Sequence, residues 1–221
     1  MLQQKTLDFL LLLKKNNTRE WFEKNRSAFI DAKEDFENFI CKLLKNTASF
    51  DNDLKDLEVK NCTFRQYRDV RFSKDKSPYK INMGAYFNRG GKKSFYAGFY
   101  FHFEPGNKSS VGGGLWMPQA PELKKVRQEI DYCFDEFNNI ITDKKFIKTF
   151  ISLEEGEMKL KKAPKGYEPD NPAIEILKLK SMVALKPVTD KELTEASLLK
   201  NTSEVFRILK PVLDFINRAL D

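Results

Sequence analysis

The spacing of apolar residues changes twice along the chain and divides it into three parts. Up to about residue 50, and again from about residue 121, apolar residues recur every three or four positions, as on one face of a helix. Between residues 63 and 116 they alternate with polar residues, which is typical of β-strands with one buried face. The pattern therefore predicts helices, then a sheet, then helices.

The first part predicts two helices. One covers residues 2 to about 15 and ends at Asn16-Asn17. The second begins after Thr18, a good N-cap, and carries an aromatic and aliphatic stripe from Trp21 to Leu44. An aromatic stripe at helical spacing is usually core, so we interpret it as packing surface.

The middle part predicts four strands, at 63–72, 81–87, 94–104 and 111–116, joined by short turns rich in Gly, Asn and Pro. In the third strand Phe95, Ala97, Phe99, Phe101 and Phe103 share one face. His102 lies on the other face, which we expect to be polar and covered by a helix. Strands with short turns favour an antiparallel meander.

The last part predicts helices at 121–138, 143–150, 172–179, 191–199 and 202–220, a loop at 160–172 and one more strand at 181–185. An acidic segment at 154–157 is expected to be solvated surface, since it lacks the ligand spacing of a calcium loop. The fold class is therefore α+β, a central antiparallel meander of about four to five strands packed with N-terminal and C-terminal helices. Without repeats or a low-complexity linker, residues 1–221 are expected to form a single domain.

Composition narrows the class of protein. The 221 residues carry 39 Lys and Arg against 32 Asp and Glu, a net charge of +7. Three cysteines without CxxC spacing suit reduced thiols, and the apolar run at 9–13 is too short for a signal peptide or a membrane span. We expect a cytoplasmic protein that does not bind membranes. The single histidine, His102, excludes a multi-histidine metal site, and the sequence predicts no cofactor and no metal.

Residues 65–80 combine six cationic side chains with only two aspartates. If 63–72 is a strand, Asp69 shares a face with Arg65 and Arg71 and can orient both guanidinium groups. A lysine-bearing loop then follows the end of the strand. The candidate ligand-binding residues are Arg65, Arg68, Asp69, Arg71, Ser73, Lys74, Asp75, Lys76, Tyr79 and Lys80. No catalytic residue is assigned.

The glycine run 112–114 does not fit a phosphate-binding P-loop, because Leu-Trp-Met-Pro follows it instead of a helix with Lys-Ser or Lys-Thr. It predicts either a place where neighbouring backbones approach closely or one that faces a ligand. Trp116 beside it could stack on a base or sugar, or belong to the core.

The segment 68–80, Arg-Asp-Val-Arg-Phe-Ser-Lys-Asp-Lys-Ser-Pro-Tyr-Lys, resembles the signature of the domain of unknown function 2461 family of uncharacterised bacterial proteins. Asn16-Asn17 with Trp21-Phe22, the run 112–116 and the run 163–167 add to the resemblance, which covers nearly the whole chain. It implies a single-domain α+β protein and assigns no catalytic residues.

Three functions remain open, in this order. The first is binding of an anionic small molecule, bearing phosphate or carboxylate groups, through the segment 65–80, with or without catalysis. The second is a structural or partner-binding protein in which that segment is an internal ion-pair brace. The third is non-specific nucleic-acid binding, which no helix-turn-helix, RRM or KH signature supports.

Overall fold

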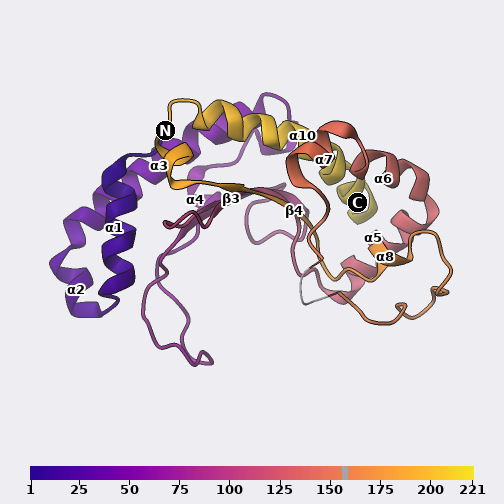
Figure 1. Cartoon of the computed structure of the whole chain (residues 1–221), viewed down its shortest axis with the longest axis horizontal. Coiled ribbons are helices and arrows are strands. Elements are labelled where there is room, and N and C mark those ends of the chain that lie inside the picture. Colours follow the sequence, from indigo (N-terminus) through magenta and orange to yellow (C-terminus); the bar gives the residue numbers. More distant parts are fainter. Residues whose placement is uncertain (156–158) are drawn as a thin grey trace.

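The chain forms an arch, with a sheet in the middle and helices over its outer face (Figure 1). The structure, a computed structural model, describes residues 1–155 and 159–221. Within these residues one antiparallel sheet has the strand order β1-β2-β3-β4. The strands are β1 (Met83–Phe87), β2 (Gly98–Phe103), β3 (Ser109–Leu115) and β4 (Met182–Val188). The meander and the α+β class predicted from the alternation are confirmed.

The helices precede and follow the first three strands. Before them come α1 (Gln4–Lys15), α2 (Arg19–Lys24), α3 (Arg26–Ala48), a 3-10 turn (Asn52–Leu54) and α4 (Val59–Cys62). After them come α5 (Ala120–Tyr132), α6 (Phe134–Ile141), α7 (Lys144–Phe150), α8 (Ile174–Leu177), α9 (Asp190–Thr194) and α10 (Leu198–Leu220). The long helices α3 and α10 pack against the strands from the same side.

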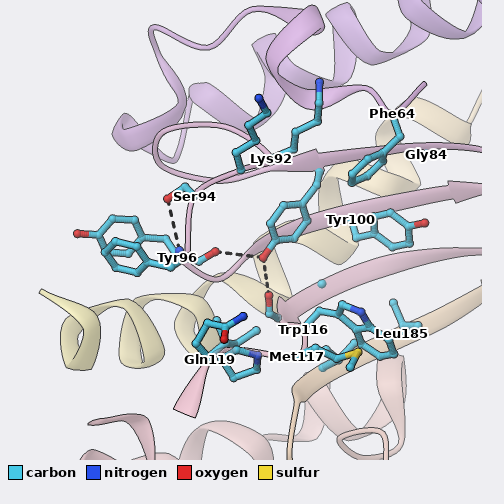
Figure 2. A pocket seen from close by; sticks show the side chains of 18 of the residues that line it. Phe64, Gly84, Lys92, Ser94, Tyr96, Tyr100, Trp116, Met117, Gln119 and Leu185 are labelled. Carbon is cyan, nitrogen blue, oxygen red and sulfur yellow. Dashed lines mark hydrogen bonds between the residues drawn. The ribbon is translucent and has the colours of Figure 1, made fainter. Parts of the chain in front are cut away.

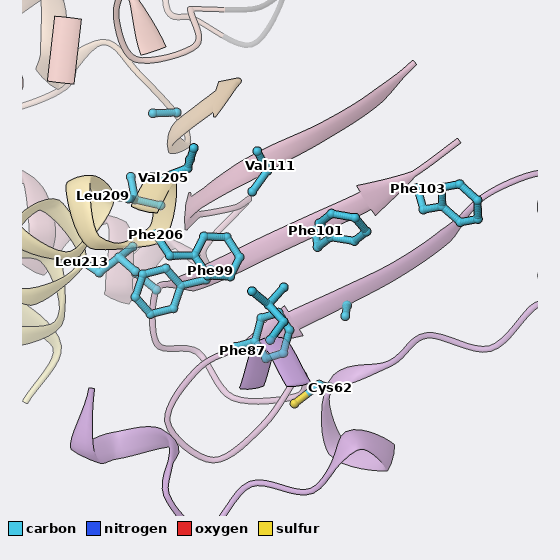
Figure 3. Close-up of a cluster of buried hydrophobic side chains, with 14 of the residues drawn as sticks. Cys62, Phe87, Phe99, Phe101, Phe103, Val111, Val205, Phe206, Leu209 and Leu213 are labelled. Carbon is cyan, nitrogen blue, oxygen red and sulfur yellow. The ribbon is translucent and has the colours of Figure 1, made fainter. Parts of the chain in front are cut away.

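The core lies between this helical layer and the phenylalanine face of the sheet. Phe99, Phe101 and Phe103 of β2 are all buried there, and the ring of Phe206 on α10 lies 4.8 Å from that of Phe99 (Figure 3). Phe39 on α3 packs against Phe101 at 5.0 Å between ring centroids. The apolar residues that alternate along β2 and those that recur every three or four positions along α3 and α10 therefore pack into one buried cluster.

Two predicted helices are each divided in the structure. The helix predicted after Thr18 divides at Asn25 into α2 and α3. The Asn25 side chain donates a hydrogen bond to the Trp21 carbonyl oxygen at 2.8 Å and so competes with the helical backbone. The helix predicted at 121–138 divides at Cys133, where the backbone leaves the helical conformation between α5 and α6. The apolar stripe continues across both breaks, so periodicity alone does not reveal them.

The predicted strand at 63–72 is wrong. Thr63 and Tyr67 make only isolated bridges, to Ala85 and Tyr79. The segment leaves the edge of β1 and folds back on itself, and the Arg68 N–H donates to the Pro78 carbonyl oxygen at 3.0 Å. We call residues 64–80 the basic hairpin. Its many charged side chains cannot enter the core, so it extends into solvent below the sheet (Figure 1).

Several boundaries also differ from the predictions. The third strand begins at Gly98, which leaves Phe95 exposed outside it, and β4 continues to Val188. Pro187 is tolerated because β4 is an edge strand. Gly156 and Glu157 of the acidic segment lie outside the described residues. None of the helices that the structure describes is both long and apolar enough to cross a membrane.

Candidate functional site

The face of the sheet opposite the helices is hollowed into a cavity of about 790 Å³. This volume lies within the range of small-molecule sites, about 300–1,000 Å³. Residues of all four strands line it, together with the base of the basic hairpin, the turn before β2 and the segment after β3 (Figure 2). We call it the sheet cavity. The prediction that a helix covers the His102 face is therefore wrong.

Glycines make this face hollow. In the strand register Gly84 is opposite His102, Gly112 is opposite Tyr100, and Gly114 is opposite Gly98. Directly opposed residues point to the same face, so four glycines share the face of Tyr100 and His102. At these positions the sheet has no side chains of its own, so the Tyr100 and Phe64 side chains lie close over Gly84 and the Tyr86 hydroxyl reaches the Gly114 carbonyl oxygen.

The run 112–114 is also where the backbones of neighbouring strands come close. Gly114 has a φ of +135°, which side-chain-bearing residues rarely adopt, and a Cβ there would overlap the Met182 carbonyl oxygen of β4. The close-approach reading of the run is thus supported. Both Gly113 and Gly114 also line the sheet cavity, so close approach of the backbones is compatible with a position facing a ligand.

Cations gather at the sheet cavity without acidic partners. Arg65, Lys80, Lys92 and Lys93 line it, and among the described residues no Asp or Glu does. The same four side chains border a second hollow of about 540 Å³ toward α3. Lys92 Nζ donates to the Lys60 carbonyl oxygen at 2.6 Å, and Lys80 Nζ lies 5.4 Å from the centre of the Phe64 ring. None of the four forms an ion pair within residues 1–155 and 159–221.

Lys80 shows the electrostatic consequence of this arrangement. Burial, and then the nearby charge of Arg65, lower the pKa of the Lys80 ammonium. Both effects disfavour its charged form, because it is partly removed from water and next to a like charge. A negative charge in the sheet cavity would offset both the burial of Lys80 and its repulsion by Arg65.

Tyr100, His102 and Glu104 form a hydrogen-bonded row along β2 on the cavity face. The Tyr100 hydroxyl lies 2.8 Å from His102 Nδ1, and His102 Nε2 lies 3.2 Å from a Glu104 carboxylate oxygen. Burial and then the Glu104 charge raise the pKa of Tyr100 to about 12, so the phenol stays protonated near neutral pH. Such a row can hold a proton at the edge of the cavity.

The predicted site residues are divided between the sheet cavity and the basic hairpin. Arg65 and Lys80, at the base of the hairpin, line the cavity. The others do not, so the ten residues do not converge on one pocket. Those away from the cavity are Arg68, Asp69, Arg71, Ser73, Lys74, Asp75, Lys76 and Tyr79.

Arg68 is the centre of a brace inside the hairpin. Its guanidinium forms an ion pair with Asp75 and donates to the Ser77 carbonyl oxygen at 3.2 Å and to the Ser73 hydroxyl at 3.4 Å. Asp75 in turn accepts from the Ser77 N–H at 2.9 Å. These contacts close the hairpin on itself and fit the brace hypothesis for this part of the segment.

The outer part of the hairpin is exposed. Arg71 donates two hydrogen bonds to Asp69, from Nε at 3.0 Å and from Nη2 at 2.7 Å. Lys76 Nζ donates to the Val70 carbonyl oxygen at 3.0 Å, and Lys74 points into solvent. Exposed pairs of this kind contribute little to stability and do not form a pocket.

Tyr79 anchors the base of the hairpin. Only 2% of its surface is exposed, and its ring stacks on Phe22 of α2 with 3.8 Å between centroids. The Asn17 side chain donates to the Tyr79 carbonyl oxygen at 2.9 Å and accepts from its N–H at 3.1 Å. Asn17 and Phe22 belong to the N-terminal motif, so two separate parts of the sequence signature meet here.

Asp75 gives a prediction for pH. Hydrogen bonds from the hydroxyl and N–H of Ser77, and then the Arg68 guanidinium, lower its pKa from an ordinary value of 3.8 to about 2. Because the folded pKa is depressed, the brace is fully present above about pH 4 and is lost as the pH falls toward 2. We expect the Asp75 carboxyl carbon to titrate in NMR with a midpoint near 2, and Ser77→Ala and Arg68→Ala each to raise it. A midpoint near 4 in the parent protein would mean that the brace is absent in solution.

Sequence reasoning missed part of the sheet cavity. Lys92 and Lys93 follow the turn at 88–91 and had no recognisable motif around them. The alternate glycines 112 and 114 in a strand were the available signal, but only the strand register adds Gly84 and Gly98 to the same face. Trp116 was a candidate for stacking, and it does line the cavity.

Fold and site together define a class of α+β protein in which helices cover one face of an antiparallel meander and the other face holds a basic, aromatic-lined cavity. The chain belongs to the DUF2461 family, described as a conserved hypothetical protein family, whose family model matches residues 5–215. The resemblance read from the sequence signature is thus confirmed. No curated protein and no solved structure matches the chain.

Proposed function

We propose that this protein binds an anionic small molecule, bearing phosphate or carboxylate groups, in the sheet cavity. The observation that carries the proposal is the set Arg65, Lys80, Lys92 and Lys93, four cations on one cavity with no acidic side chain among its described lining residues. Like charges held together repel one another and are partly desolvated, and an anionic ligand offsets both costs. The binding function expected from segment 65–80 is thereby moved from the hairpin as a whole to its base.

The brace hypothesis is supported for the remainder of the hairpin. There Arg68 and Arg71 each have a carboxylate partner, so these cations are already neutralised. We propose that residues 68–77 shape the hairpin and that residues 65 and 80 contact the ligand. Nucleic-acid binding has no comparable support, since the free cations line a concave cavity and do not follow an extended groove.

The test compares two double variants that remove the same charge. Arg65→Ala with Lys93→Ala removes two exposed cations of the sheet cavity, and Arg71→Ala with Lys74→Ala removes two from the hairpin. We expect pyrophosphate or citrate, titrated in a calorimeter, to bind the cavity variant about 100-fold more weakly. Two charge-assisted hydrogen bonds contribute about 1.5 kcal/mol each at the low end, and 1.4 kcal/mol is tenfold in Kd.

The hairpin variant should keep the parent Kd within about twofold, because screening by salt weakens the effect of distant exposed charges. Loss of binding in the hairpin variant alone would place the anion on the hairpin and contradict the proposal. So would failure of both pyrophosphate and citrate to bind the parent protein.

A further inference from the structure

The sheet cavity has an apolar side as well as a cationic one. Trp116 is 63% exposed and Phe95 52% exposed, and both line the cavity together with Met117, which is also exposed. Large apolar side chains at the surface are unremarkable when scattered, but a group around one cavity marks a binding site. Trp116 and Met117 follow β3, whereas Phe95 belongs to the segment before β2 that also carries Lys92 and Lys93, so the fold brings both segments to one cavity.

The cationic and aromatic sides lie apart. In Figure 2 Lys92 lies on one side of the strands, Trp116 and Met117 lie on the other, and Tyr100 lies between them. A ligand that satisfies both sides must therefore be elongated, with its negative charge at one end and an apolar group at the other. Inorganic anions alone would leave the aromatic side exposed to water.

The surface between the two sides suits a flat group. Its floor is aromatic: the Tyr100 and Phe64 rings lie within 3.4 Å of the position that a Gly84 Cβ would take, and the Tyr86 ring also lines the cavity. The Tyr86 hydroxyl donates to the Gly114 carbonyl oxygen at 2.8 Å. This hydrogen bond keeps the Tyr86 side chain against the sheet. Exposed aromatic side chains such as Trp116 are the groups on which bases stack.

A polar group is available at the aromatic side. Gln119 lines the cavity on the same side of the strands as Trp116, and its side chain makes no hydrogen bond within the part of the chain that the structure describes. A carboxamide offers both donors and an acceptor, which matches the edge of a heterocyclic ring better than that of a hydrocarbon ring. This favours a nucleobase over a simple aryl group.

We infer that the ligand is a nucleotide, with its phosphate groups at Arg65, Lys80, Lys92 and Lys93 and its base beside Trp116 and Gln119. The inference rests on the proposed function and adds the class of ligand to it. It requires the two ends of one molecule to contribute separately to affinity, which can be measured.

The experiment is a calorimetric series with ATP, tripolyphosphate and adenosine on the parent protein, on Trp116→Ala and on Tyr132→Ala. Tyr132 is a matched control, because it is 91% exposed and does not line the cavity. We expect ATP to bind the parent at least tenfold more tightly than tripolyphosphate, and adenosine to bind most weakly. Trp116→Ala should remove that ATP advantage and leave tripolyphosphate unchanged, since stacking on one aromatic side chain changes affinity by about tenfold or more. Tyr132→Ala should change nothing.

Two outcomes separate the inference from the function on which it rests. If ATP and tripolyphosphate bind equally and Trp116→Ala affects neither, the ligand is an anion without a stacked base; the inference is then wrong and the proposed function stands. If neither of them nor citrate binds the parent protein, both are wrong. A loss of tripolyphosphate binding in Trp116→Ala would also contradict the inference, because the base and phosphate ends would then not be separate.

Discussion

Replacing Gly114 by alanine is expected to lower the free energy of unfolding by about 2–6 kcal/mol. Its φ of +135° is a conformation in which a side chain is strained, at a cost of about 1–3 kcal/mol. The added Cβ would also overlap the Met182 carbonyl oxygen, a backbone atom of the neighbouring strand, and forced overpacking costs about 1–3 kcal/mol. Urea denaturation followed by circular dichroism measures the change.

Gly84→Ala is the matched control for this experiment. It makes the same chemical change on the same face of the sheet, but the new Cβ meets only the ends of side chains, the Tyr100 hydroxyl at 3.1 Å and the Phe64 ring at 3.4 Å. We expect its stability to stay within about 1 kcal/mol of the parent. Equal losses in the two variants would show that the close contact between β3 and β4 does not constrain Gly114.

Replacing Tyr79 by alanine is expected to cost about 3–5 kcal/mol, the usual range for removing a large buried aromatic side chain. The loss follows from the stack on Phe22 and from the burial of all but 2% of the residue. Tyr67→Ala is the comparison, because that ring packs against Tyr79 at 5.1 Å but is 49% exposed, so it should cost clearly less. Thermal or urea unfolding of the two variants gives the difference.

Tyr79→Phe distinguishes an anchor from a ligand-binding residue. It keeps the ring and its packing, so we expect stability within about 1 kcal/mol of the parent and an unchanged Kd for pyrophosphate. A large loss of pyrophosphate affinity in a stable Tyr79→Phe protein would restore the sequence-based prediction that Tyr79 contacts the ligand.

The strands and long helices were predictable because each has one buried face that repeats at its own period. The alternation of Phe99, Phe101 and Phe103 predicts a half-buried strand, and burial of these three rings follows directly from it. The breaks at Asn25 and Cys133 were not predictable from the stripe, because a short interruption leaves the apolar spacing almost unchanged.

The basic segment shows why a local pattern misled. Alternation in 63–72 is compatible with a strand, yet a regular strand also needs a partner, and from Tyr67 onward the chain pairs with its own return. Of the ten candidate residues predicted from the sequence, Arg65 and Lys80 line the sheet cavity. Only the fold shows that Arg68 and Asp75 are already paired with each other.

The sequence by itself determined the class of fold, the family signature and the excess of positive charge in segment 65–80, because these follow from the local order of residues. The tertiary structure decided which of the positive charges lie together at one cavity. It places Lys92 and Lys93 beside Arg65 and Lys80, and it aligns the glycines of three strands on one open face. Both depend on strand register and chain reversal, which bring together residues far apart in sequence and are set by the packing of the whole core.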